Sequence, residues 1–324
     1  MSQLLEAVVP FLAGMAGVLV AGQPAIRALG RYGAPVRFED CPPLLAQQQG
    51  KAGTPTMGGL VVLGISVLVA AAAGGLSRPE GWMVLGAVIG LGGVGLADDC
   101  LKFTGPNAVG LRSLPKLLLA MGVGAAFGIA SRGTGIVELP GMHRTIALGG
   151  WWIPFAMLVM TGCAHAVNLS DGLDGLAAGC LAIAFAALGI WALNDPRQAS
   201  LVPWCAGLAG TCAGFLWFNS YPASVFLGDV GALGLGAALA AISLLSGTAL
   251  WLPIIGGIFV LEAVSVMLQV ASYKWRGKRR IFRVAPIHHH FTLGGLSEPK
   301  VMVRFWMAGL LLAVLGLASR EGLG

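Results

Sequence analysis

Apolar stretches alternate with short polar segments along the whole chain of 324 residues. A run of about 20 apolar residues is long enough to cross a bilayer as a helix. Ten stretches approach that length: 4–26, 58–76, 81–97, 114–131, 150–167, 174–193, 199–218, 230–248, 250–273 and 301–319. The ninth is long enough to tilt or bend, and Pro253 near its start gives a reason for a bend. The pattern predicts an all-α, polytopic integral membrane protein with ten transmembrane helices, in a single domain that covers residues 1–324.

One polar segment has a different pattern. Residues 135–150 read GIVELPGMHRTIALGG, with two short β-prone runs around a Pro-Gly turn. This order predicts a small hairpin on the surface of the protein.

The composition supports the membrane assignment. Only 10% of the residues are charged, whereas a soluble domain carries about 25%. Fifty glycines suit helices that pack closely in lipid. The six cysteines form no CxxC pair and lie mostly in or beside apolar runs, which favours small buried side chains over disulfides or zinc ligands.

The positive charges predict an orientation. Fifteen of the 20 lysines and arginines lie in or beside the loops that follow the odd-numbered stretches. Cytoplasmic loops carry such an excess, so we expect these loops inside and both termini outside.

The unusual polar chemistry falls in these same loops, which indicates one shared site on the cytoplasmic face. A transporter would instead bury its charges near the membrane midplane in interrupted helices, and away from the ends of the predicted spans Glu262 and Gln269 are the only charged or amide side chains. The polar segments are KAGTPTMGG (Lys51–Gly59), ADDCLK (Ala97–Lys102), NLSDGLDG (Asn168–Gly175), FNSYPASVFLGDVGALGLG (Phe218–Gly236) and FRVAPIHHHF (Phe282–Phe291).

The segment after the fifth stretch holds Asn168, Asp171 and Asp174 at intervals of three residues. A helical turn would place the three on one face. Carboxylates beside hydrocarbon are costly unless they face water and bind something. A simple helix cap is the alternative interpretation.

Three further carboxylates indicate a cation. Asp98 and Asp99 are adjacent, so a cation or proton must compensate their repulsion, and Asp229 lies between glycines at the start of the eighth stretch. Hard carboxylate oxygens suit Mg²⁺, which commonly binds substrate phosphates as well. The set fits a Mg²⁺-assisted phosphoryl transfer, although an ordinary N-cap also accounts for Asp229 alone.

Donors for phosphate are present in the same loops. Lys51, Lys102 and Lys116 can neutralise phosphate oxygens, although positive-inside charge accounts equally well for Lys102. Thr56 offers a hydroxyl beside a rigid turn. The triplet His288–His290 follows a basic run and can bind a metal or, when protonated, a diphosphate.

Taken in order, the motifs GTPTMGG, ADD, NLSDGLDGLA, FLGDVGALGLG, EAVSVMLQV, FRVAPIHHHF and VRFW resemble the polyprenyl-phosphate N-acetylhexosamine-1-phosphate transferases. GTPTMGG together with the histidine triplet is specific for the branch of phospho-N-acetylmuramoyl-pentapeptide transferases. The resemblance implies ten helices, a homodimer, and a cytoplasmic site that opens towards lipid in the bacterial cytoplasmic membrane. It also implies transfer of phospho-MurNAc-pentapeptide from its UDP carrier to undecaprenyl phosphate, which gives lipid I and UMP with Mg²⁺ as cofactor. Membrane lipids are further expected partners, and nucleic acid is not.

The resemblance also implies roles for individual residues. The catalytic set is Asp98, Asp99, Asp229 and His289, and Asp229 with Asn168 would hold the metal. The substrate-binding set is Lys51, Thr56, Lys116, Asn168, Asp171, Asp174, Asn219, Gln269, His288 and His290. The sequence departs from the usual family pattern at two positions. Cys100 follows the aspartate pair where an aromatic residue is usual, and Ala232, three residues after Asp229, stands where Ser is common.

Three alternatives stay open. The chain can be a sibling enzyme that uses UDP-GlcNAc or a related sugar nucleotide. It can be a transporter of lipid-linked sugars that kept the fold. If it is the muramoyl enzyme, the lipid phosphate can attack directly, or Asp229 can act first as a nucleophile.

Overall fold

The computed structural model describes residues 2–32, 51, 53–102, 110–142 and 144–321. Almost all of its regular structure is helical. The α-helices are α1 (Ser2–Tyr32), α3 (Gly59–Ala72), α4 (Pro79–Leu101), α5 (Ser113–Ala130), α6 (Trp152–Ser170), α7 (Leu176–Leu193), α8 (Val202–Asn219), α9 (Gly228–Leu245), α10 (Leu252–Ile255), α11 (Gly257–Trp275), α12 (Ile287–Thr292) and α13 (Glu298–Glu321). Short 3₁₀ turns are η2 (Arg132–Thr134), η3 (Gly149–Trp151), η4 (Pro196–Gln198) and η5 (Ala249–Trp251).

Eight helices in the described part of the chain are long and apolar enough to cross a membrane, namely α1, α4, α5, α6, α7, α9, α11 and α13. The chain is therefore an all-α, polytopic membrane protein, as predicted. Each of the ten predicted stretches overlaps a helix, but α8 is not among the eight and α3 has only 14 residues. The count of ten spans stays a prediction.

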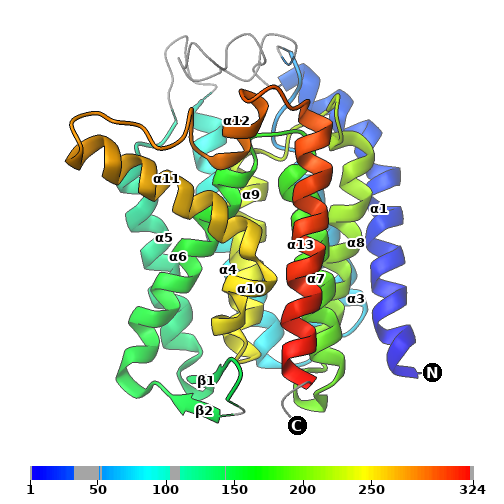
Figure 1. The fold of residues 1–324 in the computed structure, drawn as a ribbon. Helices are drawn as coiled ribbons and strands as arrows, with labels where there is room; N and C mark the ends of the chain where they lie inside the picture. The colour runs from blue at the N-terminus through cyan, green and yellow to red at the C-terminus, as the bar shows by residue number, and fades with distance from the viewer. Residues whose placement is uncertain (1, 33–50, 52, 103–109, 143, 322–324) are drawn as a thin grey trace.

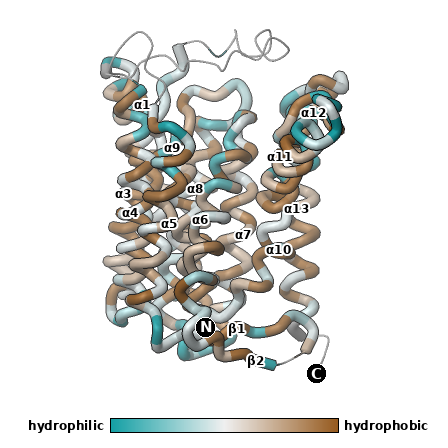
Figure 2. The backbone as a smooth tube through the Cα atoms, turned by 90° about the vertical axis from the view of Figure 1, so that its left-hand side faces the viewer, coloured by the Kyte–Doolittle hydropathy of each residue, from teal (hydrophilic) through white to brown (hydrophobic). Residues whose placement is uncertain are grey.

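The helices run side by side between two polar ends. Helix α1 begins and α13 ends near the end that carries the two strands, whereas α12 lies at the opposite end (Figure 1). Figure 2 shows apolar residues along the middle of the helices and hydrophilic residues gathered towards the ends. This arrangement matches a bundle with a hydrocarbon-facing belt.

The predicted hairpin is confirmed. Strand β1 (Ile136–Leu139) pairs with β2 (Arg144–Ala147) in antiparallel register, with Ile136 opposite Ala147 and Leu139 opposite Arg144. The amide of Glu138 donates to the carbonyl of Gly247 at 3.0 Å, which attaches the hairpin to the turn after α9.

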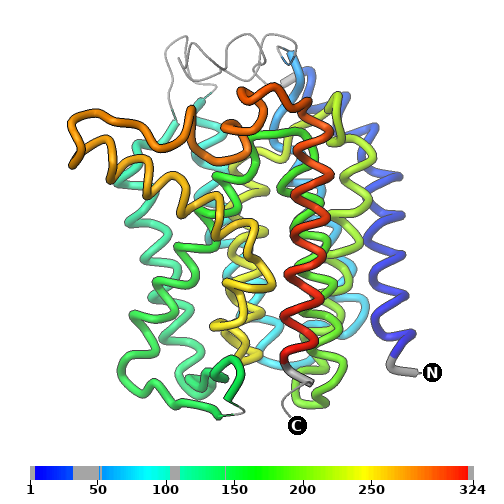
Figure 3. Tube along the Cα trace, in the orientation of Figure 1, coloured from blue at the N-terminus to red at the C-terminus, as the bar shows by residue number. Residues whose placement is uncertain are grey.

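The predicted bend in the ninth stretch is also confirmed. The chain breaks at Gly256, three residues after Pro253, where α10 ends and α11 begins. After this break α11 leans away from α13 (Figure 3). A proline followed by glycines is a common cause of such a kink, since proline removes a donor and glycine tolerates the altered backbone.

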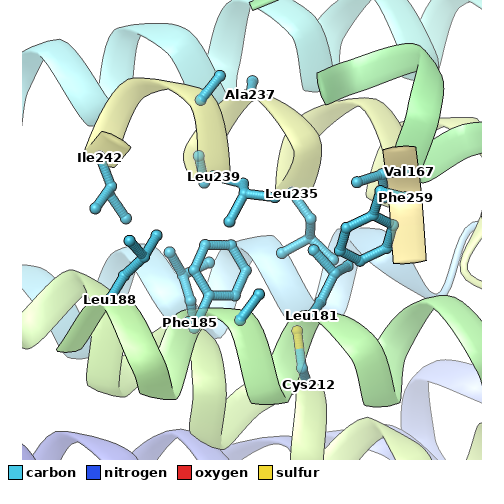
Figure 4. Packing of buried hydrophobic residues seen from close by; sticks show 14 of the residues in the cluster. Val167, Leu181, Phe185, Leu188, Cys212, Leu235, Ala237, Leu239, Ile242 and Phe259 are labelled. Carbon is cyan, nitrogen blue, oxygen red and sulfur yellow. The ribbon is translucent and has the colours of Figure 1, made fainter. Parts of the chain in front are cut away.

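Helix α9 is the centre of the packing. It contacts α3, α4, α6 and α7, and 15 of its 18 residues are buried. Leu181, Phe185 and Leu188 of α7 pack towards Leu235 and Leu239 of α9 (Figure 4). The first turn of α9, which contains Asp229, is thereby held in a fixed position.

Candidate active site

A group of three carboxylates forms where the end of α4 meets the start of α9. At Gly95 the two backbones touch, because an added Cβ would collide with the backbone carbonyl of Asp229. One turn later, Asp98 and Asp99 lie beside Asp229, with ligand oxygens of the three within 4.8 Å of one another. We call these three residues the carboxylate cluster.

Two lysines neutralise most of its charge. The Nζ atom of Lys102 lies 2.7 Å from Asp98, 3.3 Å from Asp99 and 3.0 Å from Asp229. The Nζ atom of Lys116 lies 2.5 Å from Asp229 and 3.2 Å from Asp98. Burial alone would lower the pKa of Lys102, but the neighbouring carboxylates outweigh it and raise that pKa. Three carboxylates and two ammonium groups leave a formal charge of −1 at this point.

Backbone amides orient the two carboxylates of α4. The amide of Leu111 donates to Oδ1 of Asp98 at 2.7 Å, and the amide of Val230 donates to Oδ2 of Asp99 at 3.0 Å. Gly228, two residues before Val230, has a φ of +75°, and a side chain there would collide with Thr56 and Asp99. The cluster therefore requires glycine at this position.

The donor set fits Mg²⁺. Three hard carboxylates converge on one point at the ends of two packed helices, and Asp98 and Asp99 are buried. In the described part of the chain no other group of three potential metal ligands is this close together.

A second ion-pair group lies at the start of α13. The Nζ atom of Lys51 lies 2.7 Å from Asp174 and 2.5 Å from Glu298. The amide of Ala223 donates to the other Asp174 oxygen at 3.0 Å, and the amide of Asp174 donates to Glu298 at 2.9 Å. Burial works against the charge on Lys51, yet the two carboxylates raise its pKa.

Asp171 lies between the two groups. Burial raises its pKa well above the usual range, and the charges of Asp229, Asp99 and Asp174 add to this effect while Lys51 opposes it. The charges of both groups therefore act on this one carboxylate.

The histidine triplet forms α12. His288 is fully buried, and its Nδ1 atom lies 3.1 Å from Oε1 of Glu262 in α11. The ring of His289 lies 4.1 Å from that of His288, centroid to centroid. Burial, together with the charges of His288 and Lys51, lowers the pKa of His289 to about 3, so His289 is neutral at physiological pH.

Several predicted binding residues have hydrogen-bond partners within the protein. Gln269 accepts from the amides of Ile281 and Phe282 and donates to the carbonyl of Phe282, so its amide holds the loop after α11. His290 accepts from the amide of Arg283 at 3.1 Å. Asn219 accepts from the amide of Gly175 and donates to the carbonyl of Val225. Asn168 is half-buried in the last turn of α6.

Two residues have a larger part in the site than the sequence indicated. Lys102, named above as a possible phosphate donor but not among the residues that the resemblance implies, lies four and three residues after Asp98 and Asp99 and contacts all three members of the carboxylate cluster. Glu298 lies 247 residues from its partner Lys51, so no local pattern connects them.

Fold and site together define a multi-pass membrane protein with a polar centre at one end of its helices. The carboxylates of this centre suit a divalent cation, and its lysines suit phosphate. The model of glycosyl transferase family 4 matches residues 81–247, and signature 1 of the phospho-N-acetylmuramoyl-pentapeptide-transferases matches residues 51–63.

Similar proteins of that name cover most of the chain. The one from Desulforudis audaxviator is 45% identical over 293 residues, which is 85% of this chain and 86% of the relative. Those from Heliobacterium modesticaldum and Solidesulfovibrio magneticus are 45% and 41% identical, over 83% and 85% of this chain and 84% and 82% of the relatives. The chain belongs to the phospho-N-acetylmuramoyl-pentapeptide transferases of glycosyl transferase family 4.

Proposed function

We propose that this chain transfers phospho-MurNAc-pentapeptide from UDP-MurNAc-pentapeptide to undecaprenyl phosphate, giving lipid I and UMP. The observation that carries the proposal is the carboxylate cluster with Lys102 and Lys116 at the ends of membrane helices, in a chain of this family. Phosphoryl transfer depends on the positioning of phosphates and on charge stabilisation, and this site supplies both signs of charge.

In the proposed step, an oxygen of the lipid phosphate attacks the β-phosphorus of the UDP-sugar. A new P–O bond forms, the bond from that phosphorus to the bridging oxygen breaks, and UMP leaves with the electron pair. Lys102 and Lys116 exchange their carboxylate contacts for contacts with phosphate oxygens. Asp98 positions the attacking lipid phosphate or accepts its proton, and neutral His289 donates a hydrogen bond to the diphosphate.

Mg²⁺ is the cofactor of this proposal: Asp229 and Asn168 would hold it, with Asp98 and Asp99 beside Asp229 as further oxygen donors. When bound, such an ion supplies charge stabilisation to phosphate oxygens. A route in which Asp229 first acts as a nucleophile uses the same residues.

The second ion-pair group, around Lys51 and Asp174, is the proposed binding site for the nucleotide part of the substrate. Lys51, Asp174 and Asp171 would lie along the uridine diphosphate portion, with Asn219 next to Asp174 and with Thr56 at Gly228, on the side of Asp99. His288 and His290 fix the shape of α12 near the sugar, and Gln269 fixes the loop that leads to it.

The same proposal includes the topology. Ten spans, both termini in the periplasm, a site on the cytoplasmic face, a homodimer and residence in the bacterial cytoplasmic membrane follow from the charge distribution and the family. The structure is compatible with an even number of crossings, since α1 begins and α13 ends on one side (Figure 1).

Release of UMP from UDP-MurNAc-pentapeptide by purified protein with undecaprenyl phosphate tests the proposal. We expect release that depends on both substrates and on Mg²⁺, and little or none from UDP-GlcNAc. Preference for UDP-GlcNAc would instead identify a sibling enzyme, and flipping of a lipid-linked sugar without UMP release would identify a transporter.

A further inference from the structure

A buried carboxylate lies directly behind the histidines of α12. Glu262 is in the second turn of α11, its side chain is 0% exposed, and Oε1 lies 3.1 Å from Nδ1 of the equally buried His288. Among the described residues, neither oxygen of Glu262 and neither ring nitrogen of His288 has a hydrogen-bond partner, so the 3.1 Å approach is a close polar contact and not an aligned hydrogen bond. A carboxylate inside a membrane helix is costly, so its presence beside His288 indicates a use for it.

His288 is confined on its other side by the loop between α6 and α7. A methyl group on Gly172 would collide with Nε2 of His288 and lie 2.8 Å from its Cε1 atom. The same methyl group would lie 3.3 Å from Nε2 of His289. The two imidazoles therefore fill the space between α11 and the loop that carries Asp171 and Asp174.

The Glu262 carboxylate, 3.1 Å from Nδ1, restrains the orientation of the His288 ring. A carboxylate next to Nδ1 favours the imidazole form that carries its proton on that nitrogen and leaves Nε2 facing the loop. His289 contacts this ring edge to face, with 4.1 Å between the ring centroids and 61° between the ring planes, and the charge of Lys51 acts on it as well. A change in the orientation of His288 will thus move His289 relative to the rest of the site.

We infer that Glu262 is a positioning residue for the phosphoryl transfer, which acts through His288 to hold the ring of His289 in place. The inference rests on the proposed function for the role of His289, but the contact chain from Glu262 to His289 does not. Stability alone does not account for the pair, because apolar replacements of buried ion pairs are commonly as stable or more so.

The first test is independent of catalysis. Protein labelled with ¹⁵N-histidine is compared by NMR in detergent for wild type, E262Q and E80Q, with signals assigned from single histidine-to-glutamine variants. Glu80 is the control, a carboxylate with a buried oxygen in the first turn of α4, at the opposite end from Asp98. We expect E262Q to shift the imidazole nitrogens of both His288 and His289 and to leave His165 unchanged, and E80Q to shift none of them. An unchanged His289 signal in E262Q, or equal shifts in E80Q, would overturn the inference.

The second test measures UMP release from UDP-MurNAc-pentapeptide. We expect E262Q to lower kcat at least ten-fold with less than a three-fold change in KM for the nucleotide substrate. In an H289A background, where the group being positioned is gone, E262Q should cost less than two-fold. Equal losses in both backgrounds would mean a general structural role and would refute the inference. If the wild type releases no UMP, the proposed function fails, and the NMR comparison still decides the contact chain.

Discussion

Replacing Lys116 with methionine should tighten the binding of a divalent cation and slow the reaction at the same time. Its side chain is 13% exposed, and its ammonium group lies 2.5 Å from Asp229 and 3.2 Å from Asp98. The carboxylate cluster with its two lysines has a formal charge of −1, so a divalent cation would make it +1. Without Lys116 the occupied site would be neutral.

The size of the effect follows from Coulomb's law. A divalent cation and an ammonium about 5 Å apart repel by about 7 kcal/mol at an effective dielectric constant of about 20. Lys102 remains in the variant, and in the wild type Lys116 can swing aside, so most of this repulsion is avoided. We expect a gain of about 1–2 kcal/mol, which corresponds to roughly ten-fold tighter binding. Turnover should fall at least about 100-fold, because a cation facing the phosphates is lost.

Binding can be measured with Mn²⁺ by electron paramagnetic resonance, on purified protein without nucleotide. The variant K300M is the matched control, because Lys300 is exposed near the start of α13 and its loss changes the total charge equally. Weaker or unchanged Mn²⁺ binding in K116M, with the protein still folded, would refute the charge argument. Tighter binding in K300M would show that total charge rather than the cluster is responsible.

Three other outcomes are expected. Asp229→Asn should reduce UMP release at least about 1000-fold at any Mg²⁺ concentration while the protein stays folded, and substantial activity would remove Asp229 from the centre of the reaction. Because burial lowers the pKa of His289 to about 3 from an unfolded value of about 6.5, the unfolded chain binds more protons between these pH values. The stability that this residue contributes is complete above about pH 6.5 and lost as pH falls towards 3, so the melting temperature of wild type should fall more steeply there than that of His289→Gln. An alkaline phosphatase reporter fused after Gly324 should be active in the periplasm, and a cytoplasmic location would contradict the ten-span topology.

The helices could be predicted because a long apolar run in a membrane protein leaves few alternatives. The stretch 114–131 and helix α5 agree within one residue, since Arg112 and Arg132 bound the apolar run on both sides. The stretch 58–76 was predicted too long. Helix α3 ends at Ala72, because Gly74 takes a positive φ of +83° that terminates the helix.

The site was predictable where its members are close in sequence. Asp98 and Asp99 with Lys102 form one helix turn, and their chemistry is visible in the letters ADDCLK. The pairing of Lys51 with Glu298 depends on how α13 is placed, and sequence spacing carries no such information. Gln269 was expected at the substrate because of the family resemblance, and nothing in the sequence indicates that its amide also bonds to the backbone of Ile281 and Phe282 in the loop after α11.

The short length of α3 has a consequence for the depth of the proposed reaction in the membrane. Its 14 residues extend about 21 Å, less than the roughly 30 Å of a bilayer's hydrocarbon layer. The amides of Gly58 and Gly59 donate to the carbonyls of Phe226 and Leu227, so the start of α3 is tied to the segment just before Asp229. In the proposed topology, the bilayer beside α3 would thin, or headgroups would sink, until they meet this level. In the proposed reaction, a lipid phosphate would then reach the carboxylates without leaving its own leaflet, and the water-soluble substrate would be the one that moves towards the membrane interior.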